Sequence, residues 1–507
     1  KTSDGYVFQS AAHQTYMTSD AGLSSNAENI SISDLNASVT DYSVKYDLSA
    51  LNALDSLNGI QVISRLHTLG LSRSDLMNPE TSMTSLNTNI QSALSGLPTQ
   101  TVQYTGNDVD DLNQFLQNNT GKIVQLTQDI QVYKNTNGSF GIIMVPSDTI
   151  LDGNGHSLVM KAGYTEAPDV GVVLYVYKNG VIPSTNCGVK NLSTDIPYVN
   201  SINVFSADNI LLENNTLNNA TKSGIMISDE YGSTVNGIIR GNTINNVGDD
   251  AIAVYGNHSN LLIDSNRISG AKGFAGIAIS CLQNGQQIRV DNETTGPHDI
   301  IVTRNVISGC SGEALYCIGS YKTYITYNTL RDSILEGICL DSGCIGNYFA
   351  HNEVVNNGIA GGLPGVSIDN GIYNIVDSNN IYNNSCSGIK LVRTGLGNII
   401  VNNICTDNAY NQMGAKSSGI DIEPLAVETE NLGYIDGLGS NWNVVLNNTV
   451  TGSHDFGVFI ADDDTANNGG SSCENVIMYN KFSSAYTFGA ADFSSMSSTV
   501  KNNITLN

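Results

Sequence analysis

The segment Asn209-Ile-Leu-Leu-Glu-Asn-Asn-Thr-Leu217 indicates the architecture, because the same motif recurs along the rest of the chain. It consists of Asn or Asp, two or three apolar residues, a short polar pair, Asn, any residue and another apolar residue. From about residue 205 onward it occurs at least nine times, for example at 260–268, 299–307 and 398–404. Each copy reads as strand, asparagine turn and strand, and such a recurring unit indicates coils stacked along one axis.

The turn asparagines give the length of one coil. Their successive differences are 27, 24, 39, 23, 24, 27, 23, 46, 32 and 22 residues, so seven of ten fall between 22 and 27. That length suits three short strands per coil, and the three long intervals predict loops inserted into regular coils. Asn suits the turn because it tolerates left-handed backbone angles and can hydrogen-bond to the next Asn along the stack. The residues in this column are Asn215, Asn242, Asn266, Asn305, Asn328, Asn352, Asn379, Asn402, Asn448, Asn480 and Asn502.

A second column of apolar residues supplies the third strand of each coil. Its members usually follow Gly or Ala, and alternation points them inward and leaves the residues between them facing outward. The expected interior is therefore a dry aliphatic stack. The column consists of Ile225, Ile252, Ile277, Leu315, Ile338, Val366, Ile389, Ile420 and Val458.

Charge and composition exclude several classes of protein. The 507 residues include 22 Lys and Arg against 47 Asp and Glu, a formal net charge of -25, which would repel nucleic acid. No apolar run approaches the roughly 20 residues that span a bilayer, so we expect no membrane insertion. The nine cysteines form no CxxC pair and no Cys/His cluster with zinc spacing, so no metal site is indicated.

The chain divides near residue 100. Residues 1–100 are rich in Ser, Asn and Asp, with helical patches around 48–71 and 86–97, and we predict a partly helical N-terminal extension of unknown role. Residues 101–507 are predicted to form the stacked coils. Within them, 108–116 reads as an amphipathic helix followed by a strand at 123–126, and this helix would cap the open first coil.

The repeat resembles that of the pectate-lyase-like superfamily over roughly residues 150–507. The resemblance implies an all-β fold, a right-handed parallel β-helix, often found in secreted or cell-surface proteins that handle polysaccharides. It also implies that trimers or filaments are alternatives to a monomer, since phage tailspikes of this fold are trimeric.

The segment Gly248-Asp249-Asp250-Ala251-Ile252-Ala253-Val254 resembles the Asp-Asp segment of polygalacturonases, whose acids activate water and protonate the leaving group. The neighbouring coils depart from that family. Lys222-Ser223-Gly224 stands in place of Asn-Thr-Asp-Gly, and Phe274-Ala275-Gly276 in place of Gly-His-Gly. The Arg-Ile-Lys signature of polygalacturonases has only an approximate counterpart at 389–393, so a true polygalacturonase is not expected.

The third strand of each coil opens with Gly or Ala followed by a residue of the second apolar column. Acids directly before that Gly or Ala are candidate catalytic groups, because equal positions in successive coils lie about 4.8 Å apart. Glu313 and Glu336 fall in adjacent coils, at roughly 5 Å, the spacing of a retaining glycosidase. Asp250 and Glu313 are two coils apart, at roughly 10 Å, nearer the inverting spacing. Like-charge proximity would raise one pKa and leave a proton for the leaving oxygen. The alternative is that these acids are solvated turn residues.

A second column, just past the strand centre, carries Asp341 and Asp369, with Lys390, Arg393 and Glu423 nearby. This column could hold the catalytic acids instead, or bind Ca²⁺ in a uronate lyase, which would also need a basic residue.

Tyr255 and His258, which follow the Asp-Asp segment, could contact a sugar, although His258 also fits an ordinary turn.

The leading functional hypothesis is an extracellular glycoside hydrolase that cuts a neutral or weakly charged polysaccharide. It needs no cofactor, with Ca²⁺ as the alternative just described. The main rival is a non-catalytic surface, filament or adhesin protein, because solenoids also serve as rigid spacers and a fold does not prescribe a function. A Ca²⁺-dependent lyase and a phage-type depolymerase are further alternatives.

Overall fold

The computed structural model describes residues 78–507, apart from 135–140, 178–180, 284–285, 288–295, 394, 410–417, 425–438, 453, 462–471, 473, 484–487, 495–497 and 507. It also describes two paired strands, β1 (Tyr16–Met17) and β2 (Leu23–Ser24). The helical patch expected at 48–71 lies outside the described residues.

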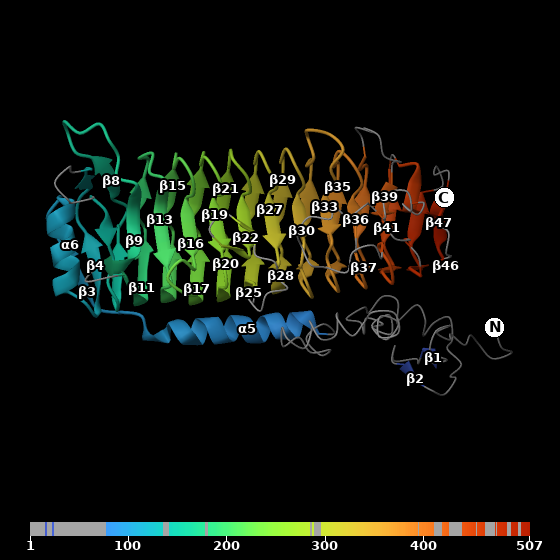
Figure 1. Ribbon diagram of the computed structural model, residues 1–507, viewed down its shortest axis with the longest axis horizontal. Coiled ribbons are helices and arrows are strands. Elements are labelled where there is room, and N and C mark those ends of the chain that lie inside the picture. The colour runs from blue at the N-terminus through green and yellow to red at the C-terminus, as the bar shows by residue number, and fades with distance from the viewer. Residues whose placement is uncertain are drawn as a thin grey trace.

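The chain winds into a solenoid with three long sheets, and consecutive coils stack along one axis (Figure 1). Strands of one coil pair in parallel with the equivalent strands of the next coil. In sheet 3, for example, Ile225, Ile252 and Ile277 are successive partners. The all-β parallel solenoid expected from the repeat is confirmed.

Sheet 1 precedes the asparagine turn and has fifteen described strands. They are β3 (Thr101–Tyr104), β4 (Lys122–Leu126), β7 (Thr149–Asp152), β11 (Thr185–Lys190), β14 (Asp208–Glu213), β17 (Val235–Arg240), β20 (Ser259–Asp264), β25 (His298–Thr303), β28 (Tyr321–Thr326), β31 (Tyr348–Ala350), β34 (Ile375–Asp377), β37 (Ile399–Val401), β40 (Val444–Leu446), β43 (Val476–Met478) and β46 (Thr499–Lys501).

Sheet 2 follows the turn and has fourteen described strands. They are β5 (Ile130–Val132), β8 (Ser157–Met160), β12 (Ser193–Thr194), β15 (Thr216–Asn218), β18 (Thr243–Asn245), β21 (Arg267–Ser269), β26 (Val306–Ser308), β29 (Thr329–Arg331), β32 (Glu353–Val355), β35 (Asn380–Tyr382), β38 (Ile404–Thr406), β41 (Thr449–Thr451), β44 (Lys481–Ser483) and β47 (Ile504–Leu506).

Sheet 3 carries the second apolar column of the sequence. Its strands are β6 (Ile143–Met144), β9 (Val170–Tyr177), β10 (Val181–Pro183), β13 (Asn200–Phe205), β16 (Ile225–Ser228), β19 (Ile252–Tyr255), β22 (Ile277–Ser280), β27 (Leu315–Ile318), β30 (Ile338–Asp341), β33 (Val366–Asp369), β36 (Ile389–Val392), β39 (Ser418–Ile422), β42 (Phe456–Ile460) and β45 (Phe488–Asp492). A short hairpin, β23 (Leu282–Gln283) with β24 (Gln286–Gln287), follows β22.

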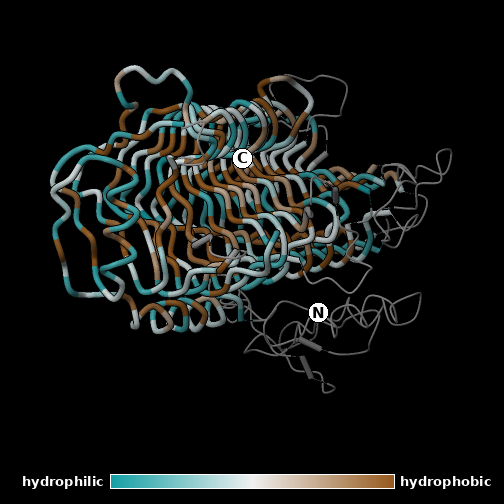
Figure 2. The backbone as a smooth tube through the Cα atoms, turned by 60° about the vertical axis from the view of Figure 1, so that its left-hand side comes forward, coloured by the Kyte–Doolittle hydropathy of each residue, from teal (hydrophilic) through white to brown (hydrophobic). Residues whose placement is uncertain are grey.

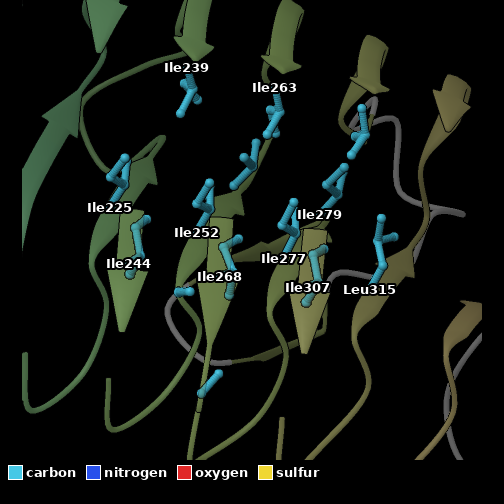
Figure 3. Packing of buried hydrophobic residues seen from close by; sticks show 14 of the residues in the cluster. Ile225, Ile239, Ile244, Ile252, Ile263, Ile268, Ile277, Ile279, Ile307 and Leu315 are labelled. Atoms are coloured by element: carbon cyan, nitrogen blue, oxygen red, sulfur yellow. The ribbon is translucent and has the colours of Figure 1, made fainter. Parts of the chain in front are cut away.

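The interior is a stack of aliphatic side chains from all three sheets. Ile225, Ile252 and Ile277 of sheet 3 are wholly buried and lie over one another (Figure 3). Apolar and polar segments recur in the same order from coil to coil along the tube (Figure 2). Burial of apolar surface on this scale is the main favourable contribution to folding.

Helix α6 (Val109–Asn118) caps the N-terminal end of the solenoid, as expected (Figure 1). Its first residue follows Asp108, whose side chain accepts a hydrogen bond from the Asp110 amide at 3.0 Å. Val109, Leu112 and Leu116 are wholly buried on the solenoid interior, so the helix shields the first coil from water.

Buried asparagines form a hydrogen-bonded ladder at the turn between sheets 1 and 2. The Asn328 amide and its Nδ2 both donate to Asn352 Oδ1, at 2.8 and 3.0 Å, while Nδ2 also donates to the Val302 carbonyl at 2.9 Å. The same pattern repeats from coil to coil. The ladder comprises Asn215, Asn242, Asn266, Asn305, Asn328, Asn352, Asn379, Asn403, Asn448, Asn480 and Asn503.

Two positions of the predicted ladder were wrong by one residue. Asn403 and Asn503 join the ladder, whereas Asn402 and Asn502 precede them in the left-handed conformation, with φ of 59° and 54°. The left-handed position also accepts Ser265, Arg304 and Tyr327. The turn therefore selects Asn for its buried amide contacts and not for its backbone angles.

The other two corners carry shorter asparagine ladders that the sequence analysis missed. One lies between sheets 3 and 1 and comprises Asn347, Asn374, Asn398, Asn443 and Asn475. The other lies between sheets 2 and 3 and comprises Asn357, Asn384 and Asn408.

Helix α5 (Pro79–Ala93), continued by a 3-10 turn at Leu94–Gly96, lies lengthwise along the outer face of sheet 1 (Figure 1). Leu86, Ile90 and Leu94 pack with the outward-facing Ile238, Leu262 and Ile301. This confirms the helix expected at 86–97 and places it against the solenoid. None of the described helices is long and apolar enough to cross a bilayer.

We predict that Asn352→Ala lowers the free energy of unfolding by about 2–4 kcal/mol, because it leaves the buried Asn328 amide and Nδ2 without their acceptor. Denaturant unfolding measures the change. The matched control is Asn380→Ala, at an exposed position of sheet 2, which should change stability by less than about 0.5 kcal/mol. Equal effects of the two substitutions would contradict a structural ladder.

We predict that Ile90→Ala loosens α5 from sheet 1, because it empties a fully buried contact worth about 2–4 kcal/mol. Hydrogen exchange of residues 79–93 should accelerate in this variant. Asn87→Ala, an exposed position of the same helix, should leave the exchange rates unchanged or slower. Unaltered exchange in Ile90→Ala would show that the contact does not hold the helix.

Candidate functional site

The outer face of sheet 3 brings three of the predicted acids into one column. Ile252, Ile277, Leu315 and Ile338 are successive partners, so Asp250, Glu313 and Glu336 occupy equal positions before their strands. Glu313 and Glu336 therefore lie in adjacent coils, about 4.8 Å apart along the stack. Asp250 lies two coils before Glu313.

Glu313 and Glu336 are almost completely buried, at 6% and 8% exposure. Burial raises the pKa of Glu336 to about 7, and repulsion from Glu313, Asp369 and Asp341 adds to the effect. Burial also raises the pKa of Glu313, with a contribution from Asp341. Within the described part of the chain, Glu313 Oε2 has no hydrogen-bond partner.

Asp341 and Asp369 form the second column, again in adjacent coils. Asp341 accepts hydrogen bonds from Tyr316 Oη at 2.6 Å and from the Ser342 amide and hydroxyl at 2.6 and 2.9 Å. Burial and repulsion from Asp341 raise the pKa of Asp369 to about 7, although Arg393 opposes the rise. We call Glu313, Glu336, Asp341 and Asp369 the acid cluster, since every member raises the pKa of another member or has its own pKa raised by one.

Asp250 is wholly buried and both of its oxygens accept hydrogen bonds. One accepts from the Tyr255 hydroxyl and the other from the Ala275 amide at 2.8 Å. Burial raises the pKa of Asp250 to about 7, and the preceding Asp249, which is half-buried, contributes repulsion. This arrangement orients the Tyr255 ring and leaves Asp250 without direct access to a ligand.

Aromatic side chains line the face beside the acid cluster. Tyr255 and Phe274 pack against a buried group that includes Tyr316, and the Phe274 and Tyr316 rings meet edge to face at 4.8 Å. The sequence analysis missed Phe274 and Tyr316. Strand alternation could have found Tyr316, because it lies between the inward-facing Leu315 and Cys317.

The basic residues near the cluster are bound to other acids. Lys390 Nζ lies 2.8 Å from Glu423 Oε2, and Arg393 Nη1 lies 2.9 Å from Asp369 Oδ2. Burial alone would lower the pKa of Lys390, but Asp421 and Glu423 outweigh it and raise that pKa. Lys390 is therefore protonated and poorly suited to act as a base.

His258 lies away from the outer face. It is wholly buried in the turn before β20, where Nδ1 accepts from the Thr234 amide at 2.9 Å and Nε2 lies 2.8 Å from the Tyr255 carbonyl. The sequence prediction of a sugar contact at His258 therefore has no geometric support.

The described residues include no group of three or more His, Cys, Asp or Glu side chains arranged to hold a metal ion. The eight described cysteines are all buried. The face is thus built from carboxyl groups, aromatic rings and two ion pairs.

The model of the right handed beta helix region matches residues 173–354 and 286–432, which together make up just over half of the chain. The protein belongs to this family of right-handed parallel β-helices. No curated protein matches the chain.

Several solved structures are similar in shape at low identity. The A-module of mannuronan C-5 epimerase AlgE6 from Azotobacter vinelandii shares 14% identity, with a TM-score of 0.42, over 79% of this chain and 94% of that one. The surface adhesin PfbA of Streptococcus pneumoniae shares 11% identity, with a TM-score of 0.44, over 79% and 90%. A tailspike protein of E. coli bacteriophage HK620, in complex with a pentasaccharide, shares 14% identity, with a TM-score of 0.48, over 76% and 74%.

We predict that the protein loses stability as pH rises from about 4.5 to about 7, because folded Glu336 keeps a proton that the unfolded chain releases in this window. Glu336→Gln mimics the protonated form, so the loss should be smaller by about 1–3 kcal/mol. Denaturant unfolding at pH 5 and pH 8 measures the difference. Glu166→Gln, at an exposed loop position, should lose as much stability as the unaltered chain.

Proposed function

We propose that the protein is an extracellular polysaccharide-degrading enzyme, a glycoside hydrolase whose catalytic pair is Glu313 and Glu336. The observation that carries the proposal is the placement of these two buried carboxyl groups in register on adjacent coils. Glycoside hydrolysis requires two carboxyl groups on either side of the scissile bond, one of which holds a proton.

Glu336 is the proposed general acid, because burial and its acidic neighbours raise its pKa to about 7. Its proton passes to the glycosidic oxygen as the bond from that oxygen to the anomeric carbon breaks. Glu313 is the proposed nucleophile, since its Oε2 has no partner among the described residues. Its carboxylate bonds to the anomeric carbon as the glycosidic oxygen leaves, which gives a glycosyl ester. Water then displaces the Glu313 ester and gives a proton back to Glu336.

The coil spacing favours retention of configuration. Adjacent coils put the two carboxyl groups about 5 Å apart, as in retaining enzymes, whereas inverting enzymes need about 6.5–9.5 Å. The Asp250 and Glu313 pair is less suitable, because both Asp250 oxygens are already bonded. Asp250 is instead proposed to position Tyr255, whose ring can support a sugar.

The lyase alternative is weaker on this geometry. A uronate lyase needs a base, and both Lys390 and Arg393 are held in ion pairs on the same face. Asp341 and Asp369 are proposed to support binding, because Asp341 is held by Tyr316 and Ser342 and Asp369 by Arg393. The proposal implies that the partner is a polysaccharide and that the protein is secreted or displayed on the cell surface. The oligomeric state stays a prediction.

We expect Glu336→Gln and Glu313→Gln each to lower kcat by about 10²–10⁴-fold, because each removes one half of the acid and nucleophile pair. The measurement is a reducing-sugar assay on a panel of glycans, with ultraviolet detection of unsaturated products. Glu166→Gln is the control and should retain full activity. Unsaturated products would contradict a hydrolase, and no turnover of any glycan would favour the non-catalytic surface protein.

A further inference from the structure

The acid cluster has an excess of negative charge that the surrounding residues do not balance. Among the described residues, two cations lie near its four carboxyl groups: Arg393, whose Nη1 contacts Asp369, and Lys390, which also lowers the pKa of Asp369. Lys390 is engaged by Glu423 at 2.8 Å and influenced by Asp421, which is wholly buried. Asp249 and Asp250 add further acid two coils earlier. Acids therefore outnumber cations at this face, and an acidic ligand would meet net repulsion.

Glu313 carries one of the two buried carboxyl oxygens of the cluster that lack a donor among the described residues, and the other is Asp369 Oδ1. The Glu313 side chain is 6% exposed, and no group within the described part of the chain donates a hydrogen bond to its Oε2. A buried carboxyl oxygen without a donor is costly, so the position favours a ligand that donates hydrogen bonds. Glu336 lies in the next coil and Asp341 raises the pKa of Glu313. Glu313 and Glu336 are thus the two acids that the coil register places side by side.

An ammonium group matches this arrangement better than a hydroxyl group or a neutral amide does. It brings a full positive charge and three donors, so it can bond to both carboxyl groups of this pair at once. The edge-to-face pair of Phe274 and Tyr316 lies beside the cluster and offers aromatic surface, which attracts a cation as well as the apolar face of a sugar.

We propose that the acid cluster recognises an amino sugar, a glycan unit with a free ammonium group that binds between Glu313 and Glu336. The inference rests on the proposed function for its glycan, and it names the substrate class that the charge of the site selects. A glycan rich in carboxylate or sulfate groups is excluded by the same charge.

The test uses three hexasaccharides with one backbone that differ only at C2: cellohexaose with a hydroxyl, its N-acetylated amino counterpart, and the free amino hexamer. Binding is measured by calorimetry at pH 6, low salt and low temperature, with chromatography to verify intact ligand. The free amino hexamer should bind at least about tenfold more tightly than either of the others. D-glucosamine and D-glucose serve as a second pair that does not depend on the linkage.

The binding should also release protons, because a bound ammonium group stabilises the ionised form of the cluster. Titrations in two buffers of different ionisation enthalpy measure this release. The released proton comes from Glu336, because its raised pKa keeps this carboxyl group protonated before the ligand binds. Glu313→Gln should abolish the preference for the amino hexamer, whereas Glu166→Gln should preserve it and so exclude a general effect of the net charge of -25.

The outcomes separate this inference from the proposed function. Equal binding of the three hexamers, equal weakening by the two variants, or no binding of either the amino hexamer or D-glucosamine overturns the inference. Hydrolysis of a neutral glycan without any preference for the amine sustains the proposed function alone. Selective binding of the amine without cleavage of any glycan sustains the inference and removes the hydrolase.

Discussion

The parallel register between coils is the constraint on which the rest of the structure depends. It sets equal positions about 4.8 Å apart, and it does so in all three sheets at once. The buried asparagine ladders reinforce this register, because each amide donates to the next coil from both its backbone and its side chain. A slip by one residue would break every rung and turn the aliphatic column of sheet 3 outward.

The same register creates the electrostatic character of the outer face. Glu313 and Glu336 are 23 residues apart in the chain, yet the winding makes them neighbours. Asp341 and Asp369 add further acidic groups at the other end of strands β30 and β33. Such mutual repulsion destabilises the fold unless protons or a cationic ligand offset it. The face thus has the properties expected of a site that sacrifices some stability for chemistry.

The sequence determined most of the winding, because strand alternation and coil length are both visible in a linear pattern. It placed the capping helix at 108–116, the inward column from Ile225 to Val458, and the adjacency of Glu313 and Glu336. It failed where neighbouring asparagines compete, since Asn402 and Asn403 look alike until hydrogen bonding distinguishes them. It also could not reveal that His258 is buried or that Lys390 is paired with Glu423, because both depend on side-chain packing across coils.

Helix α5 changes how the solenoid should respond to force and heat. In an unbraced solenoid each coil contacts only its neighbours, and stability is close to a sum of local terms. Here α5 contacts strands from β17 to β25, and near its first residue Glu80 reaches Tyr348 in β31 at 3.4 Å. One helix thus couples coils that otherwise contact only their immediate neighbours. The coils under the helix should unravel together as one cooperative block, while those beyond it can fray singly.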